Sequence, residues 1–343
     1  MATRGTTVLA TWHFHIEISS KCTLRCPRCA RQEVPDSLVN TELDLEFFKR
    51  NFTAEFVLDN VEKITFCGDD GDPIYAHDLI PVIQYIKSIK PVEIVVVTNG
   101  SHKKPEWWRE LGGVLSEQDT VHFSIDGWDY PSNNLYRVNS DFNSIVDGIT
   151  ALRSTSECHL VWAAIVFGFN EHQLGAMKNH ARLLDMDVFQ LTKSTKFGSV
   201  YLSYGPIDEL EPSRPFVSSS HRFERDVTPI SSRGLNSQTN TKNIQLYKSA
   251  VEINGVKPLC EIGNKGLYID AQGRLFPCCW VANRYSHNSE WKAIANKFDL
   301  NRRTLADAVT DDFWSTTFKT FGWQECQTKC VASRVNEKYA TEW

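Results

Sequence analysis

The chain contains 343 residues, of which 41% are hydrophobic and 11% aromatic, so it is long and apolar enough to bury a substantial core. This composition excludes a disordered or fibrous chain and favours one large domain with one smaller domain. The formal net charge of -5 provides no general attraction for phosphate backbones. Nucleic acid is therefore not favoured as a partner.

The N-terminal residues lack the sustained apolar segment and the small-residue cleavage site of a secretory signal. The longest nearly apolar stretch, residues 160–169, is too short to span a bilayer and is rich in β-branched and aromatic residues. We therefore expect a cytoplasmic protein with no membrane partner, in which residues 160–169 form a buried strand.

Strand-like and helix-like segments alternate between residues 13 and 192. Segments rich in β-branched or aromatic residues predict strands at 13–19, 63–67, 92–97, 121–125, 159–167 and 188–192. Helices are expected at 43–51, 77–89, 105–115, 142–153 and 171–184, and the second of these places its apolar residues close to one helical face. The alternation predicts βαβ units around a parallel sheet, with reactive loops after the carboxyl ends of the strands.

The composition changes after residue 204. Prolines, serines and asparagines are frequent up to about residue 243, which is typical of a linker or lid. From residue 246 onward the chain holds half of its cysteines, and residues 266–277 predict two strands around a turn at 271–273. We interpret this part of the chain as a second, smaller domain.

Ten cysteines in a chain without an export signal indicate metal ligation or thiol chemistry rather than disulfides. Three of them, Cys22, Cys26 and Cys29, lie on the loop that follows the first expected strand. Thiolates select zinc, copper(I) or iron-sulfur clusters, and three ligands leave one iron of a cluster open for chemistry. A structural zinc site is the alternative, although no second cysteine pair of the zinc-ribbon kind follows nearby.

The spacing C-x-x-x-C-x-x-C directly after the first strand resembles the signature of the radical S-adenosylmethionine (SAM) superfamily. This resemblance implies that Cys22, Cys26 and Cys29 hold a 4Fe-4S cluster whose fourth iron is chelated by SAM. It also implies that reductive cleavage of SAM yields a 5'-deoxyadenosyl radical.

Three further segments resemble SAM-binding motifs of this superfamily, in the same order along the chain. Residues 66–73 resemble its glycine-rich segment, although an Asp stands where a Glu is common, and an ordinary capped loop is the alternative. Residues 98–100 resemble a T-N-G turn, which is also simply a good turn. Residues 124–127 with a downstream Arg resemble the group that holds the ribose or carboxylate of SAM, and a surface or substrate-pairing Arg is the alternative. The implied SAM-binding residues are Gly71, Asp72, Pro73, Thr98, Asn99, Ser124, Asp126 and Arg137.

Four cysteines of the C-terminal part, Cys260, Cys278, Cys326 and Cys330, resemble the ligands of a twitch domain, the shortened relative of SPASM domains. This resemblance implies one auxiliary 4Fe-4S cluster, and therefore two clusters in the whole chain. Cys279 is an alternative ligand to Cys278. A four-cysteine zinc site is the alternative for the group as a whole.

The resemblance divides the chain into four parts. Residues 1–205 correspond to the partial barrel, 206–245 to a linker or lid, 246–335 to the auxiliary-cluster domain and 336–343 to a C-terminal tail. The expected fold is α/β, with a partial (β/α)6 TIM-like barrel followed by a small α+β twitch domain.

The implied activity is that of a radical SAM oxidoreductase or a related radical enzyme. A flavodoxin or ferredoxin reduces the first cluster, the radical abstracts a hydrogen from a small molecule or peptide, and the auxiliary cluster relays an electron in a net oxidation or rearrangement. The alternatives are a radical epimerase of a sugar or peptide, which an essential Cys67 would favour, and a non-catalytic zinc-binding interaction module. The sequence assigns no catalytic acid, base or hydrogen donor.

Overall fold

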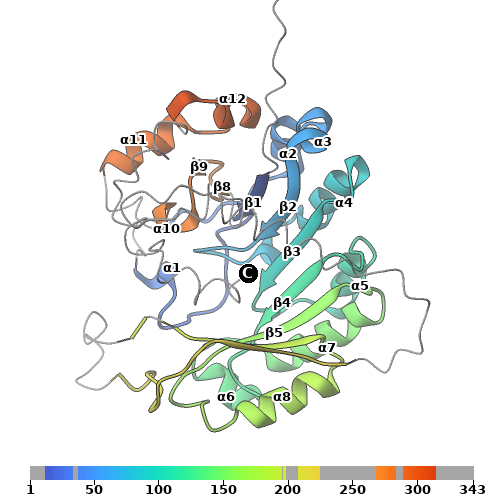
Figure 1. Cartoon of the computed structure of the whole chain (residues 1–343), viewed down its shortest axis with the longest axis vertical. Helices are drawn as coiled ribbons and strands as arrows, with labels where there is room; N and C mark the ends of the chain where they lie inside the picture. Colours follow the sequence, from blue (N-terminus) through green and yellow to red (C-terminus); the bar gives the residue numbers. More distant parts are fainter. Residues whose placement is uncertain are drawn as a thin grey trace, which may run out of the picture.

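The computed structural model describes residues 12–33, 38–194, 196–197, 208–224, 267–282 and 289–313. A nine-stranded sheet organises this part of the chain, in the order β7-β6-β5-β4-β3-β2-β1-β8-β9 (Figure 1). The strands are β1 (Trp12–Ile16), β2 (Val61–Phe66), β3 (Glu93–Thr98), β4 (Thr120–Ser124), β5 (His159–Ile165), β6 (Val188–Thr192), β7 (Ser219–Arg222), β8 (Leu267–Ile269) and β9 (Leu275–Phe276). Strands β1 to β6 and β8 pair in parallel, whereas the edge strands β7 and β9 run antiparallel to their neighbours.

The longer helices cover one face of the sheet (Figure 1). They are α2 (Leu45–Asn51), α3 (Ala54–Asn60), α4 (Leu79–Ile89), α5 (Pro105–Gly112), α7 (Phe142–Arg153) and α8 (Leu174–Leu183). Short helices occupy the connecting loops, namely α1 (Ala30–Glu33), η2 (Pro73–Tyr75) and α6 (Tyr130–Asn134), while α10 (Cys279–Ala282), α11 (Ser289–Lys297) and α12 (Leu305–Val309) follow the β8–β9 hairpin. The main hydrophobic core lies between the sheet and the covering helices.

Local sequence signals begin these helices and set their packing. Asp44 and Asp141 precede α2 and α7, and each side chain accepts a hydrogen bond from the backbone N–H three residues later. Such caps satisfy N–H groups that have no partner within the helix. A Cβ at Gly148 would lie 2.4 Å from the ring nitrogen of Trp108, so the glycine lets the buried tryptophan of α5 pack directly on the backbone of α7.

The expected fold class is confirmed, and all six expected strands and five expected helices are present between β1 and β6. The range 206–245, predicted as a linker or lid, also contributes the edge strand β7, which pairs with β6. The sequence of β7, Ser-Ser-His-Arg, is exposed throughout and has no apolar alternation. Backbone pairing with a sheet edge, rather than burial, therefore forms this strand.

The β8–β9 hairpin extends the barrel sheet at β1. Gly273 in its turn has a φ of 78°, and a Cβ there would lie 2.8 Å from the ring of Phe47 on α2. Asn51, at the end of α2, donates to the carbonyl of Leu300 at 3.4 Å and accepts from the N–H of Leu305 at 3.1 Å. The part of the C-terminal region that the structure describes is therefore joined to the barrel through both β1 and α2.

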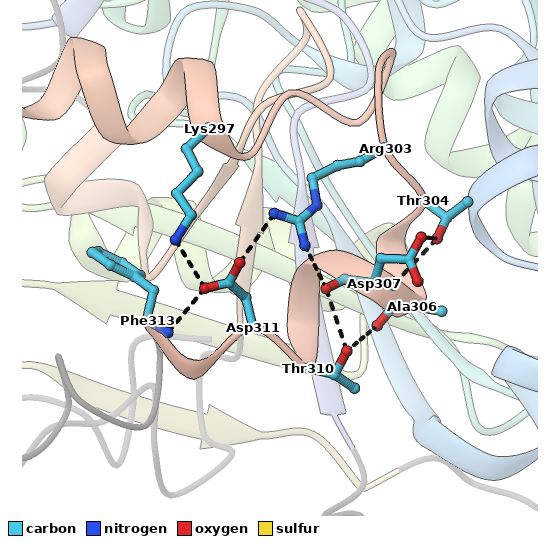
Figure 2. A network of polar contacts seen from close by, with 8 residues as sticks. All are labelled: Lys297, Arg303, Thr304, Ala306, Asp307, Thr310, Asp311 and Phe313. Carbon is cyan, nitrogen blue, oxygen red and sulfur yellow. Dashed lines mark hydrogen bonds and ion pairs between the residues drawn. The ribbon is translucent and has the colours of Figure 1, made fainter.

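Helices α11 and α12 are connected by a network of polar contacts (Figure 2). Asp311 accepts hydrogen bonds from Lys297 at 2.9 Å and from Arg303 at 3.2 Å. Arg303 also donates to the carbonyl of Asp307, whose side chain is hydrogen-bonded to Thr304, the residue that caps α12. Across the ranges described, no helix is both long and apolar enough to cross a membrane.

Candidate active site

The loop after β1 carries the three cysteines predicted to bind a cluster. Cys26 is buried, whereas Cys22 and Cys29 are half-buried. The backbone N–H of Cys29 donates to the carbonyl of Cys26 at 3.1 Å, which tightens the loop between the second and third thiols. Apolar side chains pack against the cysteines, among them Leu24, Tyr136, Phe167, Phe169, Phe197 and Leu210. The structure thus gathers the three thiols in one apolar environment at the carboxyl end of β1.

The three thiols are suited to a positively charged metal cluster. Burial raises the pKa of Cys22 to about 12 and that of Cys26 to about 11, and it also raises the pKa of Cys29. Buried thiolates need nearby positive charge, which bound metal supplies. Within the described ranges, no three His, Cys, Asp or Glu side chains converge closely enough to bind a single metal ion. A four-iron cluster binds each cysteine at a different iron, so three thiols on one loop are suited to hold such a cluster.

The structure brings together Asp72, Thr98 and Asn99, which follow β2 and β3. One carboxylate oxygen of Asp72 accepts from the Thr98 hydroxyl at 2.8 Å, and the other accepts from the backbone N–H and the side-chain amide of Asn99, both at 2.6 Å. The Asn99 amide also lies 3.8 Å from the sulfur of Cys22. Burial raises the pKa of Asp72 to about 6. Since both of its oxygens have protein donors, Asp72 holds the Thr98–Asn99 turn beside the cysteine loop.

Gly71 and Pro73 determine how closely the glycine-rich loop approaches the cysteine loop. A Cβ at Gly71 would lie 2.0 Å from the carbonyl oxygen of Ser19, so only glycine fits against the backbone at this point. The N–H of Asp72 donates to the carbonyl of Lys21 at 3.0 Å. Pro73 is the first residue of η2, which Asp72 caps. The backbone of residues 71–73 therefore lies directly along the segment that leads to Cys22.

Asp126 and Arg137 form a buried ion pair near Cys26. The Nε of Arg137 lies 2.6 Å from one carboxylate oxygen of the fully buried Asp126, whose other oxygen accepts from the N–H of Ile165 at 2.7 Å. Arg137 also donates a side-chain hydrogen bond to Cys26, and its charge lowers the pKa of that thiol against the larger effect of burial. Ser124 is half-buried at the end of β4, two residues before Asp126. The ion pair thus places an oriented cation beside the thiols.

Motif spacing gave no indication of two further polar contacts at this edge of the sheet. Glu17, the first residue after β1, accepts from the N–H groups of Asp70 at 2.7 Å and Gly71 at 2.9 Å. Its second oxygen accepts from the hydroxyl of Tyr268 on β8 at 3.1 Å. The only sequence signal for this contact is an acidic residue that directly follows a buried strand.

The second contact is an ion pair within the cysteine loop itself. Arg28, between Cys26 and Cys29, donates to a carboxylate oxygen of Asp208 at 2.8 Å, and both side chains are only 3% exposed. The N–H of Gly168 donates to the carbonyl of Leu210, and a Cβ at Gly168 would lie 2.8 Å from the next backbone carbonyl. Residues 208–211, which fall in the predicted linker or lid, therefore pack closely against the cysteine loop and the end of β5.

Most of the predicted auxiliary ligands lie outside the described residues, namely Cys260, Cys326 and Cys330. Cys278 is half-buried beside the start of α10, and the adjacent Cys279 is buried. Both pack in a small cluster with Tyr268 and Phe276 of the hairpin. The prediction of a second cluster therefore stays a prediction.

Comparison with known proteins relates this site to a protein family. Residues 16–180 match the Radical SAM superfamily, whereas no curated protein matches the sequence. The solved structure of Streptococcus suis SuiB bound to the precursor peptide SuiA is similar in fold, with a TM-score of 0.59 and 13% identity, and the match covers 97% of this chain and 74% of that one. SuiB bound to S-adenosylmethionine gives a TM-score of 0.56 with the same identity and coverage. Because the matched residues include the three-cysteine loop, the glycine-rich loop and the Asp126–Arg137 pair, residues 16–180 are identified as a radical SAM domain.

Proposed function

We propose that this chain reductively cleaves SAM and uses the resulting radical to abstract a hydrogen from a small molecule or peptide. One observation carries the proposal: the Cys22, Cys26 and Cys29 loop lies against both the Asp72–Asn99 contact and the Arg137 side chain. Cysteine ligands and polar groups for a charged cofactor thus occur at the same edge of the sheet.

The described residues suggest how the two cofactors would be held. The three cysteines would bind a 4Fe-4S cluster, and the backbone of residues 71–73 with Asn99 would bind the methionine end of SAM. When bound, cluster and SAM together supply a carbon-centred radical through one-electron reduction.

The protein's own residues position this chemistry and exclude water from it. Arg137 presents its guanidinium at the cysteine loop because Asp126 holds its Nε. Apolar residues around the loop, including Tyr136 and Phe167, keep water away from a reactive radical.

The finer parts of the proposal concern the second cluster, the substrate and the reductant. We propose an auxiliary 4Fe-4S cluster on Cys260, Cys278, Cys326 and Cys330 that accepts an electron from the substrate radical, so that the enzyme is an oxidoreductase. We also propose that it acts in the cytoplasm. A flavodoxin or ferredoxin would supply the reducing electron. The similarity in fold to SuiB bound to a precursor peptide supports a peptide substrate, and a small molecule is the other class that we propose.

Metal content and SAM cleavage test the proposal directly. Anaerobically purified wild type is compared with the Cys22, Cys26 and Cys29 triple alanine variant, and Cys158→Ala serves as a matched control because this cysteine is buried outside the site. We expect about eight irons in wild type and in the control, about four in the triple variant, and 5'-deoxyadenosine only from the first two. Zinc in place of iron, with no cleavage of SAM, would contradict the proposal.

A further inference from the structure

Glu17 is a buried carboxylate whose two oxygens face different parts of the chain. Glu17 is the first residue after β1, and it is only 3% exposed. One oxygen accepts from the N–H groups of Asp70 and Gly71 in the glycine-rich loop, at 2.7 and 2.9 Å. The other accepts from the Tyr268 hydroxyl at 3.1 Å. Glu17 therefore connects the loop after β2 to the C-terminal hairpin.

The glycine-rich loop is packed tightly around this carboxylate. A Cβ at Gly68 would lie 2.9 Å from the carboxylate oxygen of Glu17 and 2.3 Å from the carbonyl oxygen of Gly71. Two glycines thus allow the loop to turn close enough for two consecutive N–H groups to reach one oxygen. An alternative loop position would leave a buried carboxylate without these donors, which is costly.

Burial makes the third hydrogen bond of Glu17 important. Burial and the neighbouring carboxylates of Asp70 and Asp69 together raise the pKa of Glu17 to about 8, against the lowering effect of the two N–H donors. A buried carboxylate is tolerated only when its oxygens are hydrogen-bonded. The second carboxylate oxygen of Glu17 accepts its hydrogen bond from the Tyr268 hydroxyl, which lies outside the glycine-rich loop.

Tyr268 is held in place by the sheet and by ring packing. It is 1% exposed on β8, and it lies opposite His15 in the parallel pairing of β8 with β1. The two rings pack edge to face with centroids 4.9 Å apart. The backbone N–H of Glu17 also donates to the carbonyl of Ile269 at 2.9 Å. The hydroxyl therefore reaches Glu17 from a rigid position.

We infer that Tyr268 and Glu17 are positioning residues through which the C-terminal hairpin holds the glycine-rich loop in its SAM-binding conformation. The inference rests on the proposed function, because it assigns SAM to this loop. Fixing the N–H groups of Asp70 and Gly71 places Asp72, which in turn orients Asn99 beside Cys22. SAM affinity should therefore depend on a hydroxyl that lies 251 residues away from Glu17 in the sequence.

The experiment replaces one hydroxyl at each of two tyrosines. Tyr268→Phe removes the donor to Glu17, and Tyr85→Phe removes a comparable hydroxyl that donates to the Phe52 carbonyl on the helix-covered side. In anaerobically purified full-length protein we expect the Tyr268 variant, but not the control, to bind SAM about fivefold more weakly. Binding is measured by the change that added SAM produces in the electron paramagnetic resonance spectrum of the reduced cluster. The iron content of both variants should match that of wild type.

Hydrogen exchange gives a second readout that needs no SAM. We expect the Asp70 and Gly71 amides to exchange about fivefold faster in Tyr268→Phe than in wild type, while amides of α7 are unchanged. Glu17→Gln retains an acceptor oxygen for these amides and should restore most of the protection that Glu17→Leu loses. Equal exchange and equal SAM affinity in wild type and Tyr268→Phe would overturn the inference. If Tyr268→Phe shows the expected faster exchange but wild type gives no spectral response to SAM, the hydrogen bond would be confirmed and the proposed function would be overturned. The role of this loop in SAM binding would then be overturned as well.

Discussion

The carboxyl edge of the sheet and the α11–α12 region use acidic residues in opposite ways. Glu17 and Asp72 are buried, and burial raises their pKa values to about 8 and about 6. Asp311 lies between α12 and Phe313, where hydrogen bonds from Lys297, the backbone N–H of Phe313 and Arg303 lower its pKa to about 2 (Figure 2). Burial therefore dominates at the first site and hydrogen bonding to cations at the second.

The two environments give the carboxylates different contributions to structure and stability. A buried carboxylate with N–H and O–H donors specifies the position of several backbone segments, at a cost in folding free energy. An accessible carboxylate beside two cations contributes a small gain, because solvent and salt weaken the interaction. At the candidate active site, burying the carboxylates is costly, but their hydrogen bonds fix the positions of the surrounding backbone segments. The predictions below test that distinction.

The largest expected effect is at the buried Arg28–Asp208 pair. Asp208→Ala removes the carboxylate that pairs with Arg28 in a site that is 3% exposed, so we expect a loss of about 3–5 kcal/mol in unfolding free energy. Urea unfolding of the protein measures this loss. The double variant Arg28→Met with Asp208→Leu removes both charges and should recover most of the stability. A single-variant loss below about 1 kcal/mol would show that the pair is not a significant constraint on residues 208–211.

A smaller effect is expected where Thr98 supports Asp72. Thr98→Val preserves the shape of the side chain but removes the O–H that donates to Asp72 and the oxygen that accepts from the N–H of Gly100. We expect a loss of about 1–3 kcal/mol, because a buried carboxylate loses a donor. Thr150→Val is the matched control, since the Thr150 hydroxyl bonds to the Val146 carbonyl on the exposed surface of α7. Similar losses in both variants, measured by urea unfolding, would contradict a special role for Asp72.

We expect Glu17 to make the unfolding free energy depend on pH with the opposite sign to that of ordinary surface carboxylates. Its pKa is raised from 4.5 to about 8 in the folded state, so its contribution to stability is fully present below the unfolded pKa and is lost as pH rises through the folded value. Glu17→Gln removes this titration. The unfolding free energy of the variant relative to wild type should therefore rise by about 1 kcal/mol or more between about pH 5 and about pH 8. A constant difference across this window would show that Glu17 is ionised throughout.

Short-range motifs account for most of what the sequence predicted correctly. The strands of the barrel are short segments rich in β-branched or aromatic residues, and the helices between them carry caps and apolar faces that can be seen within a few residues. The cysteine loop, Asp72 and Asn99 each follow a different strand end, so the parallel order of β1, β2 and β3 is enough to bring them together. The fold and the proximity of these residues to one another were predictable for this reason.

Long-range contacts account for what the sequence did not predict. Arg28 and Asp208 are 180 residues apart, and Glu17 and Tyr268 are 251 apart, so no local spacing marks either pair. Strand β7 has four exposed residues and forms only because the edge of β6 offers backbone partners. Such features depend on the assembled sheet rather than on local propensity.

The smallest expected effect is at Asp311, and it completes the comparison. Asp311→Asn keeps an oxygen that accepts from the N–H of Phe313 but removes the charge that attracts Lys297 and Arg303. We expect a loss of about 0.5 kcal/mol near neutral pH, which diminishes at high salt. Because the folded pKa lies near 2, below the usual 3.8, this contribution is present above the unfolded pKa and disappears as pH falls through about 2. Thermal unfolding of wild type and variant at low and high salt measures the effect. A salt-independent loss as large as that of Thr98→Val would mean that the α11–α12 network is a structural requirement like the buried carboxylates, and the contrast between the two regions would then fail.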